Sequence, residues 1–562
     1  MPLSRSELIG ADLRILVTLT ARGKAHRYST QDTEVLNGTD PLLPNPLHFL
    51  GGLEPIEYED GIALGDGLAP PREASFSVLF RNDDGDGWAS IAAADADLGD
   101  AVAEVALWRV GDDWIDRRVL LSGQVLAPEY GAAQEPVSMS ITEEPGEDTA
   151  RLLHTSSIVN DDTWTDPSGY EIYNETAMGQ AYPILWGAPG CRFDIGAGVR
   201  LPAFPAFVTS MNILQKDNAT TPCTVLIAGH HTAAGSSTSN TVRLFNKSTG
   251  GTSAAISVSN SNDDLGQLIT SVTVPSTTLP IFQDDELYGY FESSATGGFI
   301  DHRHGGTLRN AADVLLDLLG RSNIRHDAVR INAIRHKLER FNFDFMINDE
   351  AGPWSIIEDQ ILPLLPLASC LGSNGLYFKY WPFDATTENA IAAIDTTSAG
   401  AWRTSSVKVS SVNDVFNRHT INYALNIETG EHSRQLVIAP RKMAAADTIS
   451  TNWQTNPYSY ASFTRYGLRD ASEIDSDIIY DPSTAQAVLD WRIRRDGMTY
   501  RTVSYDMPQE FQFLEPGDVV TLTDNEIAFS SSICLVLSVL RRAGDTSITF
   551  RTIPNWIRDS PT

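Results

Sequence analysis

Residues 74–87 read Ala74-Ser-Phe-Ser-Val-Leu-Phe-Arg-Asn-Asp-Asp-Gly-Asp-Gly87, and this stretch decides the fold class of the chain. Every second residue from Ala74 to Phe80 is apolar, which predicts a strand with one face on a hydrophobic core. The Asn, Asp and Gly residues that follow predict a tight acidic turn. Val102–Trp108 is expected to form the next strand, so this part of the chain is predicted to be a β-domain.

The length and composition predict a multidomain, mainly β protein with a small α+β section. The chain has 562 residues, of which 42% are hydrophobic and 20% are charged, and a domain usually takes about 100–200 residues. We expect four units, namely an N-terminal tube-like β-domain, an inserted small β-sandwich or barrel, an α+β joint with a short helical section, and a C-terminal tube-like β-domain. These units are predicted to span residues 1–199, 200–300, 301–395 and 396–562, respectively.

The formal net charge is −31, from 72 acidic residues against 41 Lys and Arg. This balance disfavours tight binding to nucleic acid or to an anionic membrane, because both need basic clusters. The sequence shows no secretory signal at its start and no long apolar run, so we expect folding in a cytoplasm. Widely spaced cysteines are predicted to be buried free thiols, not zinc ligands or disulfides: Cys191, Cys223, Cys370 and Cys534.

Alternating apolar residues predict further strands in the β-domains. In the first domain they lie at Asp12–Ala21, Arg118–Val125 and Val137–Thr142. In the Ser-, Thr-, Asn- and Gly-rich insertion they lie at Thr241–Phe245, Ala254–Val258 and Leu268–Val274. In the last domain we expect a hairpin from Ile421–Ile427 to Gln435–Ala439, a Pro-Gly turn after Leu514, strands at Ile533–Leu540 and Ser547–Thr552, and one helix at Ser483–Arg494.

The section after residue 305 changes to a helical pattern. Apolar residues from Ala311 to Leu319 recur at helical spacing, and Gly320 is the predicted C-terminal stop. We then expect a second helix, a strand, a short helix between two prolines, and an aromatic strand, over Asp327–Lys337, Phe341–Ile347, Pro353–Pro363 and Leu376–Trp381.

Three parts of the sequence resemble the central hub proteins of the baseplate or tail tip of long-tailed, siphovirus-like bacteriophages. The strand, acidic turn and second strand at residues 74–108 resemble the first hub domain. Gly179–Gly190, with its Pro-Ile-x-x-Gly piece, resembles hub and tip proteins. The order of helix, strand, short helix, Leu-Pro, Gly-rich turn and aromatic strand at residues 311–381 also resembles this family.

The resemblance implies a structural virion protein without enzymatic activity, assembled in the host cytoplasm and located at the tail tip or baseplate. In this family two β-domains of one chain mimic neighbouring tail-tube subunits, so a homotrimer presents a pseudo-sixfold ring to the tube. The implied partners are the distal tail or tail tube protein, the tape measure protein and a central tail fibre or tip protein. DNA would only pass through the lumen during ejection, and contact with the host cell surface is a further expectation.

Two groups of side chains are candidate metal ligands. Asn82, Asp84, Asp86 and Gly87 match the first half of a calcium loop, but Ala93 stands where the closing glutamate is needed. We therefore predict a turn in which the Asn and Asp side chains bond their own backbone. The second group comprises His230, His231, His302 and His304. It lacks a completing Cys or Glu, so surface or trimer-contact roles are predicted, with no metal and no cofactor.

No serine-hydrolase elbow, zincin helix or phosphate-binding loop occurs in the sequence. Tryptophans in the second half could form a glycan-stacking platform, although core or interface roles are favoured: Trp354, Trp381, Trp402, Trp453 and Trp491. The alternative function is therefore a receptor-binding tail protein that binds or cleaves host-surface glycans. No repeat of 20–50 residues occurs in the sequence, which disfavours this alternative. A secreted bacterial adhesin is a third possibility, disfavoured by the missing signal.

Overall fold

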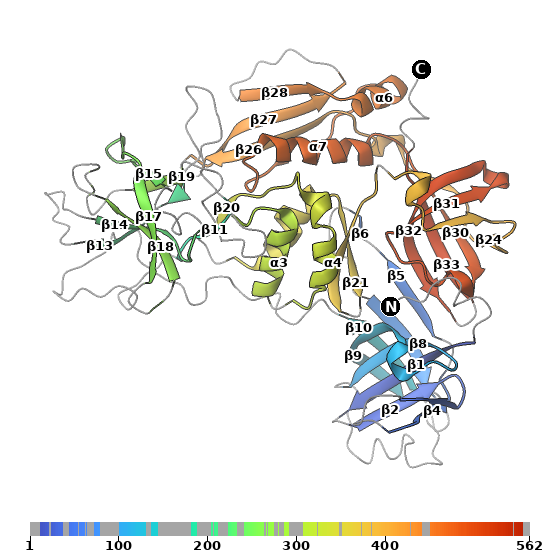
Figure 1. The fold of residues 1–562 in the computed structure, drawn as a ribbon. Coiled ribbons are helices and arrows are strands. Elements are labelled where there is room, and N and C mark those ends of the chain that lie inside the picture. The colour runs from blue at the N-terminus through green and yellow to red at the C-terminus, as the bar shows by residue number, and fades with distance from the viewer. Residues whose placement is uncertain are drawn as a thin grey trace.

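In the computed structural model, β-sheets form both ends of the chain and helices lie between them (Figure 1). The structure describes residues 12–21, 24–37, 44–53, 56–61, 63–64, 72–78, 101–130, 137–143, 181–187, 204–205, 207–211, 223–232, 241–262, 266, 268–274, 279, 281, 286–291, 307–322, 324–347, 351–372, 374–383, 385–426, 429–440, 450–542 and 545–554. The predicted mainly β, multidomain fold class is confirmed.

The N-terminal sheet is built on cross-strand apolar pairs. Strand β8 (Val102–Arg109) lies antiparallel between β1 (Leu13–Ala21) and β9 (Arg118–Tyr130). Val17, Val105 and Leu121 are direct neighbours across these strands, and all three are fully buried. The remaining strands of this part are β2 (Lys24–Ser29), β3 (Thr33–Val35), β4 (Leu47–Gly51), β5 (Glu57–Gly61), β7 (Arg72–Val78) and β10 (Val137–Glu143).

The first residues of the stretch 74–87 form a strand, as the sequence predicts. Strand β7 covers Arg72–Val78 and pairs antiparallel with both β5 and β10. Its period-two pattern therefore predicted a strand correctly. The acidic turn expected at residues 81–87 lies outside the described residues.

The C-terminal sheet closes with the predicted meander. Val503, Tyr505 and Met507 alternate into its core, where they meet Val536 and Phe550. The strands are β30 (Arg501–Pro508), β31 (Val519–Asp524), β32 (Phe529–Arg541) and β33 (Asp545–Thr552), flanked by the short β23 (Ala392–Asp395), β24 (Trp402–Arg403) and β25 (Lys408–Val409). The predicted strands Ile533–Leu540 and Ser547–Thr552 lie within β32 and β33.

The N- and C-terminal sheets are joined by direct strand pairing. Strand β32 pairs antiparallel with β5, so that Ser538, Val539, Leu540 and Arg541 face Gly61, Asp60, Glu59 and Tyr58. One sheet of 16 strands results, running from β24 through β32 and β5 to β3. Residues nearly 500 positions apart in the sequence thus share one sheet, as the neighbouring β5 and β32 in Figure 1 illustrate.

A mixed αβ unit lies beside this sheet and has a core of its own. Helix α3 (Ala311–Arg321) contributes four fully buried side chains to this core, namely Val314, Leu315, Leu318 and Leu319. The other elements around this core are α4 (Ala328–Ala333), α5 (Pro353–Ser355), α6 (Pro457–Tyr466), α7 (Pro482–Asp496), β6 (Ala63–Leu64), β11 (Ile184–Trp186), β20 (Phe345–Ile347), β21 (Leu367–Gly372), β22 (Gly375–Tyr380), β26 (His419–Asn426), β27 (Glu431–Ala439), β28 (Ser450–Thr455) and β29 (Ile474–Asp475).

Residues 419–496 contribute to this core, whereas the sequence pattern predicts that they belong to the C-terminal tube-like domain. Trp491 of α7 is buried, and its indole N–H donates to the carbonyl of Leu364 at 2.9 Å. Ile421 and Leu436 of the predicted hairpin, which forms as β26 and β27, lie in the same cluster as Leu315. The sequence of α7 does not predict this packing, because the buried residues of the helix do not fall on one narrow apolar stripe.

Three boundaries in the helical section differ from the predictions. Helix α3 continues through Gly320 to Arg321 and ends at Ser322, whose N–H donates to Leu318. The second helix divides into α4 and a 3₁₀ turn over Arg335–Leu338. The predicted Phe341–Ile347 strand shortens to β20, because Phe343 and Asp344 donate to the separate carbonyls of Arg309 and Ile478.

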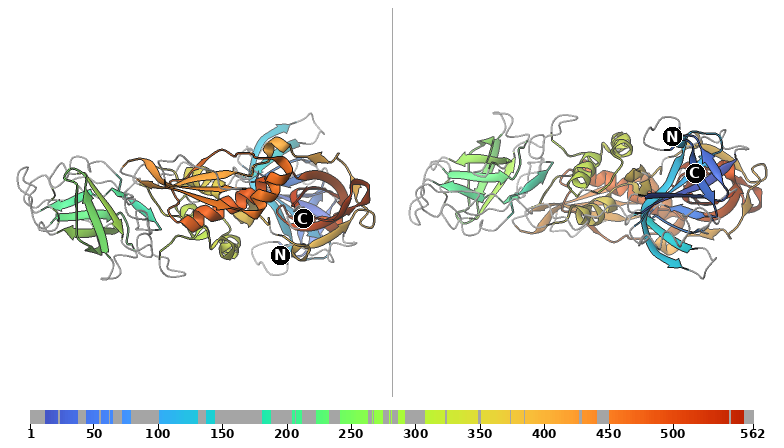
Figure 2. Two further views of the ribbon diagram at one scale, coloured as in Figure 1. Left: turned by 90° about the horizontal axis from the view of Figure 1, so that it is seen from above. Right: turned by 90° about the horizontal axis from the view of Figure 1, so that it is seen from below.

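The insertion forms the predicted β-domain, at the far side of the αβ unit from the 16-stranded sheet (Figure 2). Its eight strands are β12 (Phe204–Pro205), β13 (Phe207–Met211), β14 (Cys223–Ala228), β15 (Thr241–Asn246), β16 (Gly251–Thr252), β17 (Ile256–Asn262), β18 (Leu268–Val274) and β19 (Leu287–Phe291). The predicted strand at Ala254–Val258 begins two residues later and continues to Asn262.

Candidate functional site

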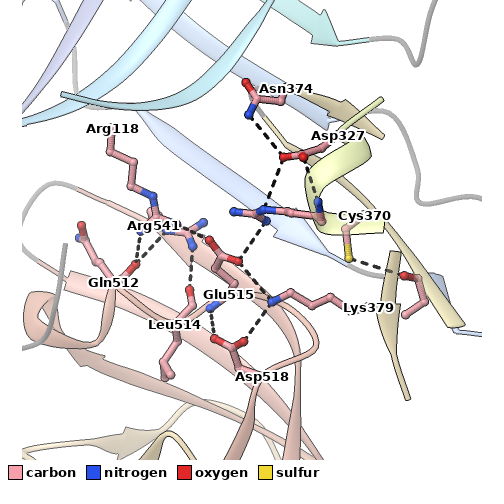
Figure 3. A network of polar contacts seen from close by, with 12 residues as sticks. Arg118, Asp327, Cys370, Asn374, Lys379, Gln512, Leu514, Glu515, Asp518 and Arg541 are labelled. Carbon is pink, nitrogen blue, oxygen red and sulfur yellow. Dashed lines mark hydrogen bonds and ion pairs between the residues drawn. The ribbon is translucent and has the colours of Figure 1, made fainter. Parts of the chain in front are cut away.

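Four ion pairs gather where the two outer sheets meet the αβ unit. Glu515, in the turn before β31, accepts from cations of three different parts of the chain (Figure 3). Arg118 comes from β9 of the N-terminal sheet, Arg330 from α4, and Lys379 from β22. One carboxylate therefore connects three structural units.

The distances show a close cluster around this carboxylate. Lys379 Nζ lies 3.2 Å from Glu515 Oε2 and 3.0 Å from Asp518 Oδ1. Arg118 Nη2 and Arg330 Nη1 each lie 3.5 Å from a Glu515 oxygen. Arg330 also lies 3.7 Å from Asp327, the residue that caps α4. The charges alternate, so each cation has a carboxylate beside it.

A tight turn holds Glu515 and Asp518 on the same side. The N–H of Glu515 donates to Asp518 Oδ2 at 2.8 Å, and the N–H of Asp518 donates back to the Glu515 carbonyl at 3.1 Å. Gly517 between them has a φ of +85°, and a Cβ there would come 2.6 Å from Lys379 Cδ. Glycine is required for both reasons, and the Pro-Gly turn predicted from the sequence is confirmed.

Arg541 supports the junction from the end of β32, where it is only 2% exposed. Its guanidinium donates to the Leu514 carbonyl at 2.7 Å and to the Gln512 carbonyl at 3.3 Å. Arg118 donates to the same Gln512 carbonyl at 3.2 Å. Buried arginine satisfies these backbone acceptors with a planar set of donors, and it lies where β32 meets β5.

The electrostatics favour the charged forms of these groups. Burial alone would raise the pKa of Glu515, but Lys379, Arg118 and Arg330 together lower it to about 2. Burial likewise opposes the charge of Lys379, yet Asp518 and Glu515 outweigh it and raise the lysine pKa. The arrangement connects parts of the protein through paired, largely buried charges.

The structure separates the two histidines of the predicted surface pair. His230 is buried, contrary to that prediction, because its Nε2 accepts the N–H of Leu185 at 3.0 Å. Burial lowers the pKa of His230 to about 3. His231 instead contacts the Ser261 carbonyl. His302, His304 and the Asn82–Gly87 turn with Ala93 lie outside the described residues, and among those described no group of three or more His, Cys, Asp or Glu could hold a metal.

The cysteines and tryptophans can be placed in part. Cys370 and Cys534 are buried free thiols, as predicted, and burial raises the pKa of Cys534 to about 12. Trp381 and Trp491 are buried, Trp354 and Trp453 are half-buried, and Trp402 is exposed. These five residues therefore do not line up as one exposed stacking platform. Cys191 and the Cys223 side chain lie outside the described part.

Sequence reasoning missed Arg118, Arg330, Lys379 and Glu515 as site residues. The signal in the sequence was the pair of carboxylates that flank Pro516-Gly517, since such a pair on a tight turn faces one direction. Their cationic partners lie far away in the sequence, Arg118 by 397 positions.

Comparison with known proteins gives a family for one part of the chain. Residues 449–533 match the model of a family described as putative phage tail protein. This segment includes α7, the Glu515 turn and the start of β32. No curated protein matches the chain, and no helix in the described ranges is long and apolar enough to cross a membrane.

Solved structures similar to this chain include a tail protein from Neisseria meningitidis MC58, at 10% identity and a TM-score of 0.36, covering 97% of this chain and 99% of that one. A 43 kDa tail protein of prophage MuSo2 from Shewanella oneidensis has 9% identity and a TM-score of 0.36, with 96% and 99% covered. TM-scores this low do not establish a shared fold. The family match at residues 449–533 confirms the resemblance at the level of a phage tail protein, and with it the expected location in the virion tail.

Proposed function

We propose that this protein is the trimeric hub of a phage baseplate or tail tip, joining the sixfold tail tube to a threefold central fibre or tip. The observation that carries the proposal is the pairing of β5 with β32, which makes two β-domains of one chain into neighbours in a continuous sheet. Three such chains would offer six β-domains to a sixfold tube. Closed cyclic symmetry would satisfy every interface of that ring.

The Glu515 cluster supports this role because a ring adaptor must keep its two β-domains at a fixed spacing. Arg118 and Glu515 connect the two sheets directly, and Lys379 and Arg330 connect both to the αβ unit. The proposal retains the four-part division of the chain, except that residues 419–496 move from the C-terminal domain to the joint, since their side chains share its core.

The proposed partners remain the distal tail or tail tube protein, the tape measure protein and the central fibre or tip protein. DNA would pass through the lumen without a dedicated binding surface, consistent with a net charge of −31. Opening of the channel for DNA ejection is part of the proposal.

The test is electron microscopy of the purified chain together with its native mass. A threefold ring with three copies is expected. A monomer that binds oligosaccharides, or a long rod, would favour the alternative of a glycan-binding or glycan-cleaving tail protein. A copy number other than three in assembled tails would contradict the hub.

A further inference from the structure

We infer that the insertion is attached to the αβ unit by an acid-sensitive contact, in which the neutral His230 ring holds the insertion in place and protonation of the ring releases it. The contact lies at the ribbon formed by β11 and β20, which pair only with each other in the described part. In Figure 1 this ribbon lies between the strands of the insertion and α3. A change in one side chain at this place therefore affects how two parts of the protein are held together.

The ribbon packs its two faces on two different cores, because successive side chains of a strand point to opposite faces. Trp186 and Phe345 lie opposite each other and belong to the core of the αβ unit, where their rings stack with 4.8 Å between centroids. Leu185 and Met346 form the next pair and pack into the core of the insertion. The ribbon is thus the layer through which the insertion contacts the αβ unit.

The αβ side of this layer is held by charged partners. The Trp186 indole N–H donates to Asp317 Oδ2 of α3 at 2.8 Å. Asp344, which precedes β20 and is fully buried, accepts two hydrogen bonds from the Arg309 guanidinium at 2.8 Å each. A release would therefore separate the insertion from the ribbon, and not the ribbon from the αβ unit.

The insertion side depends on two hydrogen bonds to the segment that follows β14. The Gly229 N–H donates to the Pro183 carbonyl at 2.7 Å. The Leu185 N–H donates to His230 Nε2 at 3.0 Å, and a ring nitrogen accepts a backbone N–H only while it carries no proton itself. The ring proton therefore sits on Nδ1 and is donated to the His231 carbonyl at 3.1 Å. In the protonated ring, two donors would face each other at Leu185.

The surroundings of the ring favour its neutral form. Burial lowers the pKa of His230 to about 3, against the effect of its hydrogen bond to the His231 carbonyl. Among the described residues, the charged or titratable groups that act on the ring are Arg321 of α3 and the His231 side chain, and both oppose its protonation. Arg321 is itself held by Asp317 at 2.8 Å. The ring is thus neutral as long as the insertion stays attached.

Release would put the His230 ring in water, where its pKa returns to the ordinary 6.5. The released state then takes up a proton below about pH 6.5, whereas the attached state does so only near about pH 3. The attachment is therefore at full strength above pH 6.5, and its equilibrium constant falls about tenfold for each pH unit below that value. This inference does not depend on the proposed hub function, because the contact lies within one chain.

The test is hydrogen exchange of the full-length chain between about pH 7 and pH 4.5, read by mass spectrometry with fragmentation and corrected for the intrinsic effect of pH on exchange. Protection of the Leu185 amide should fall about 100-fold between pH 6.5 and pH 4.5. Protection of Val225 and Val272 should persist, because these residues lie in insertion strands that are paired on both sides and release leaves the domain folded.

His230→Gln and His231→Gln are the matched pair of variants. Glutamine has a carbonyl oxygen that can accept the Leu185 N–H, but it does not titrate, so Leu185 protection in His230→Gln should not change with pH. The His231 ring contacts the Ser261 carbonyl instead, and His231→Gln should keep the fall of about 100-fold.

Equal protection of wild-type Leu185 at both ends of the pH range would overturn the inference, and this measurement needs no variant. Loss of Val272 protection together with that of Leu185 would also overturn it, because the insertion would then unfold and not be released. A fall that persists in His230→Gln would assign the pH dependence to another group. Protonation of Glu515 does not interfere, since its pKa of about 2 lies below the range of the experiment.

Discussion

Lys379 of β22 and Glu515 of the turn before β31 lie 3.2 Å apart, and this ion pair connects the αβ unit to the C-terminal sheet at the point where the N-terminal sheet also arrives. Both side chains are about four-fifths buried, at 19% and 18% exposure. Charges at this depth are costly to leave unpaired. Loss of the Glu515 charge would therefore leave the cations of this junction without their shared carboxylate.

Glu515→Gln should lower the free energy of unfolding by about 2–3 kcal/mol, because Lys379, Arg118 and Arg330 lose their shared carboxylate while staying partly buried. Denaturant unfolding followed by tryptophan fluorescence measures this. The control is Glu526→Gln, since Glu526 is 81% exposed and pairs only at the surface with Arg403, where an ion pair contributes less than about 1 kcal/mol. Equal losses from the two variants would show that the junction has no special role.

The contribution of Glu515 should disappear in acid. Its pKa is about 2 in the folded chain against an ordinary 4.5, so the folded state binds this proton less readily than the unfolded state. The stabilisation is therefore present above about pH 4.5 and is lost as the pH falls toward about 2. The difference in free energy of unfolding between wild type and Glu515→Gln should shrink across this window. A difference that stays constant with pH would contradict the pKa assignment.

Gly517→Ala should destabilise the chain by more than Gly430→Ala, although both glycines have positive φ angles of +85° and +70°. A Cβ at Gly517 would come 2.6 Å from Lys379 Cδ, whereas nothing lies within 4 Å of a Cβ at Gly430. Both variants carry the backbone strain of about 1 kcal/mol, so the extra loss at Gly517 measures the close approach of Lys379. Thermal unfolding of the matched pair tests this, and equal shifts in melting temperature would refute it.

The spacing of apolar residues within single segments predicted the strands, but it did not predict which distant segments contact one another. The alternation before Val78 and the apolar spacing around Leu315 reflect burial of one face, which is visible in any single segment. Residues 419–496 were predicted to belong to the C-terminal domain, but their side chains share the core of the αβ unit. Periodicity shows that one face of a segment is buried, but it does not show which other segment covers that face. His230 looked like a surface residue since its acceptor role toward Leu185 requires segments 45 positions apart to meet. The Pro-Gly turn was predicted, yet the three cations around Glu515 were not, because tertiary contacts alone bring them together.

The last prediction concerns the insertion, which we expect to be dispensable for self-association. Its core cluster includes Val225, Ile227, Val242 and Val272, and it meets the rest of the described chain around Leu185 and Met346. The main links are the hydrogen bonds from the Leu185 N–H to His230 Nε2 and from the Gly229 N–H to the Pro183 carbonyl, at 3.0 and 2.7 Å.

Figure 2 shows this domain at the opposite end of the molecule from the 16-stranded sheet. Replacing Ala203–Glu292 by a short Gly/Ser linker should therefore leave the number of chains in the oligomer unchanged. Removal of the insertion exposes Leu185, which is fully buried against it, so the deletion is combined with Leu185→Thr to avoid aggregation through that patch. The single variant Leu185→Thr in the full chain is the control, and it should lower the melting temperature without changing the oligomer. A deleted chain that folds by circular dichroism but stays monomeric would place the insertion in the subunit interface.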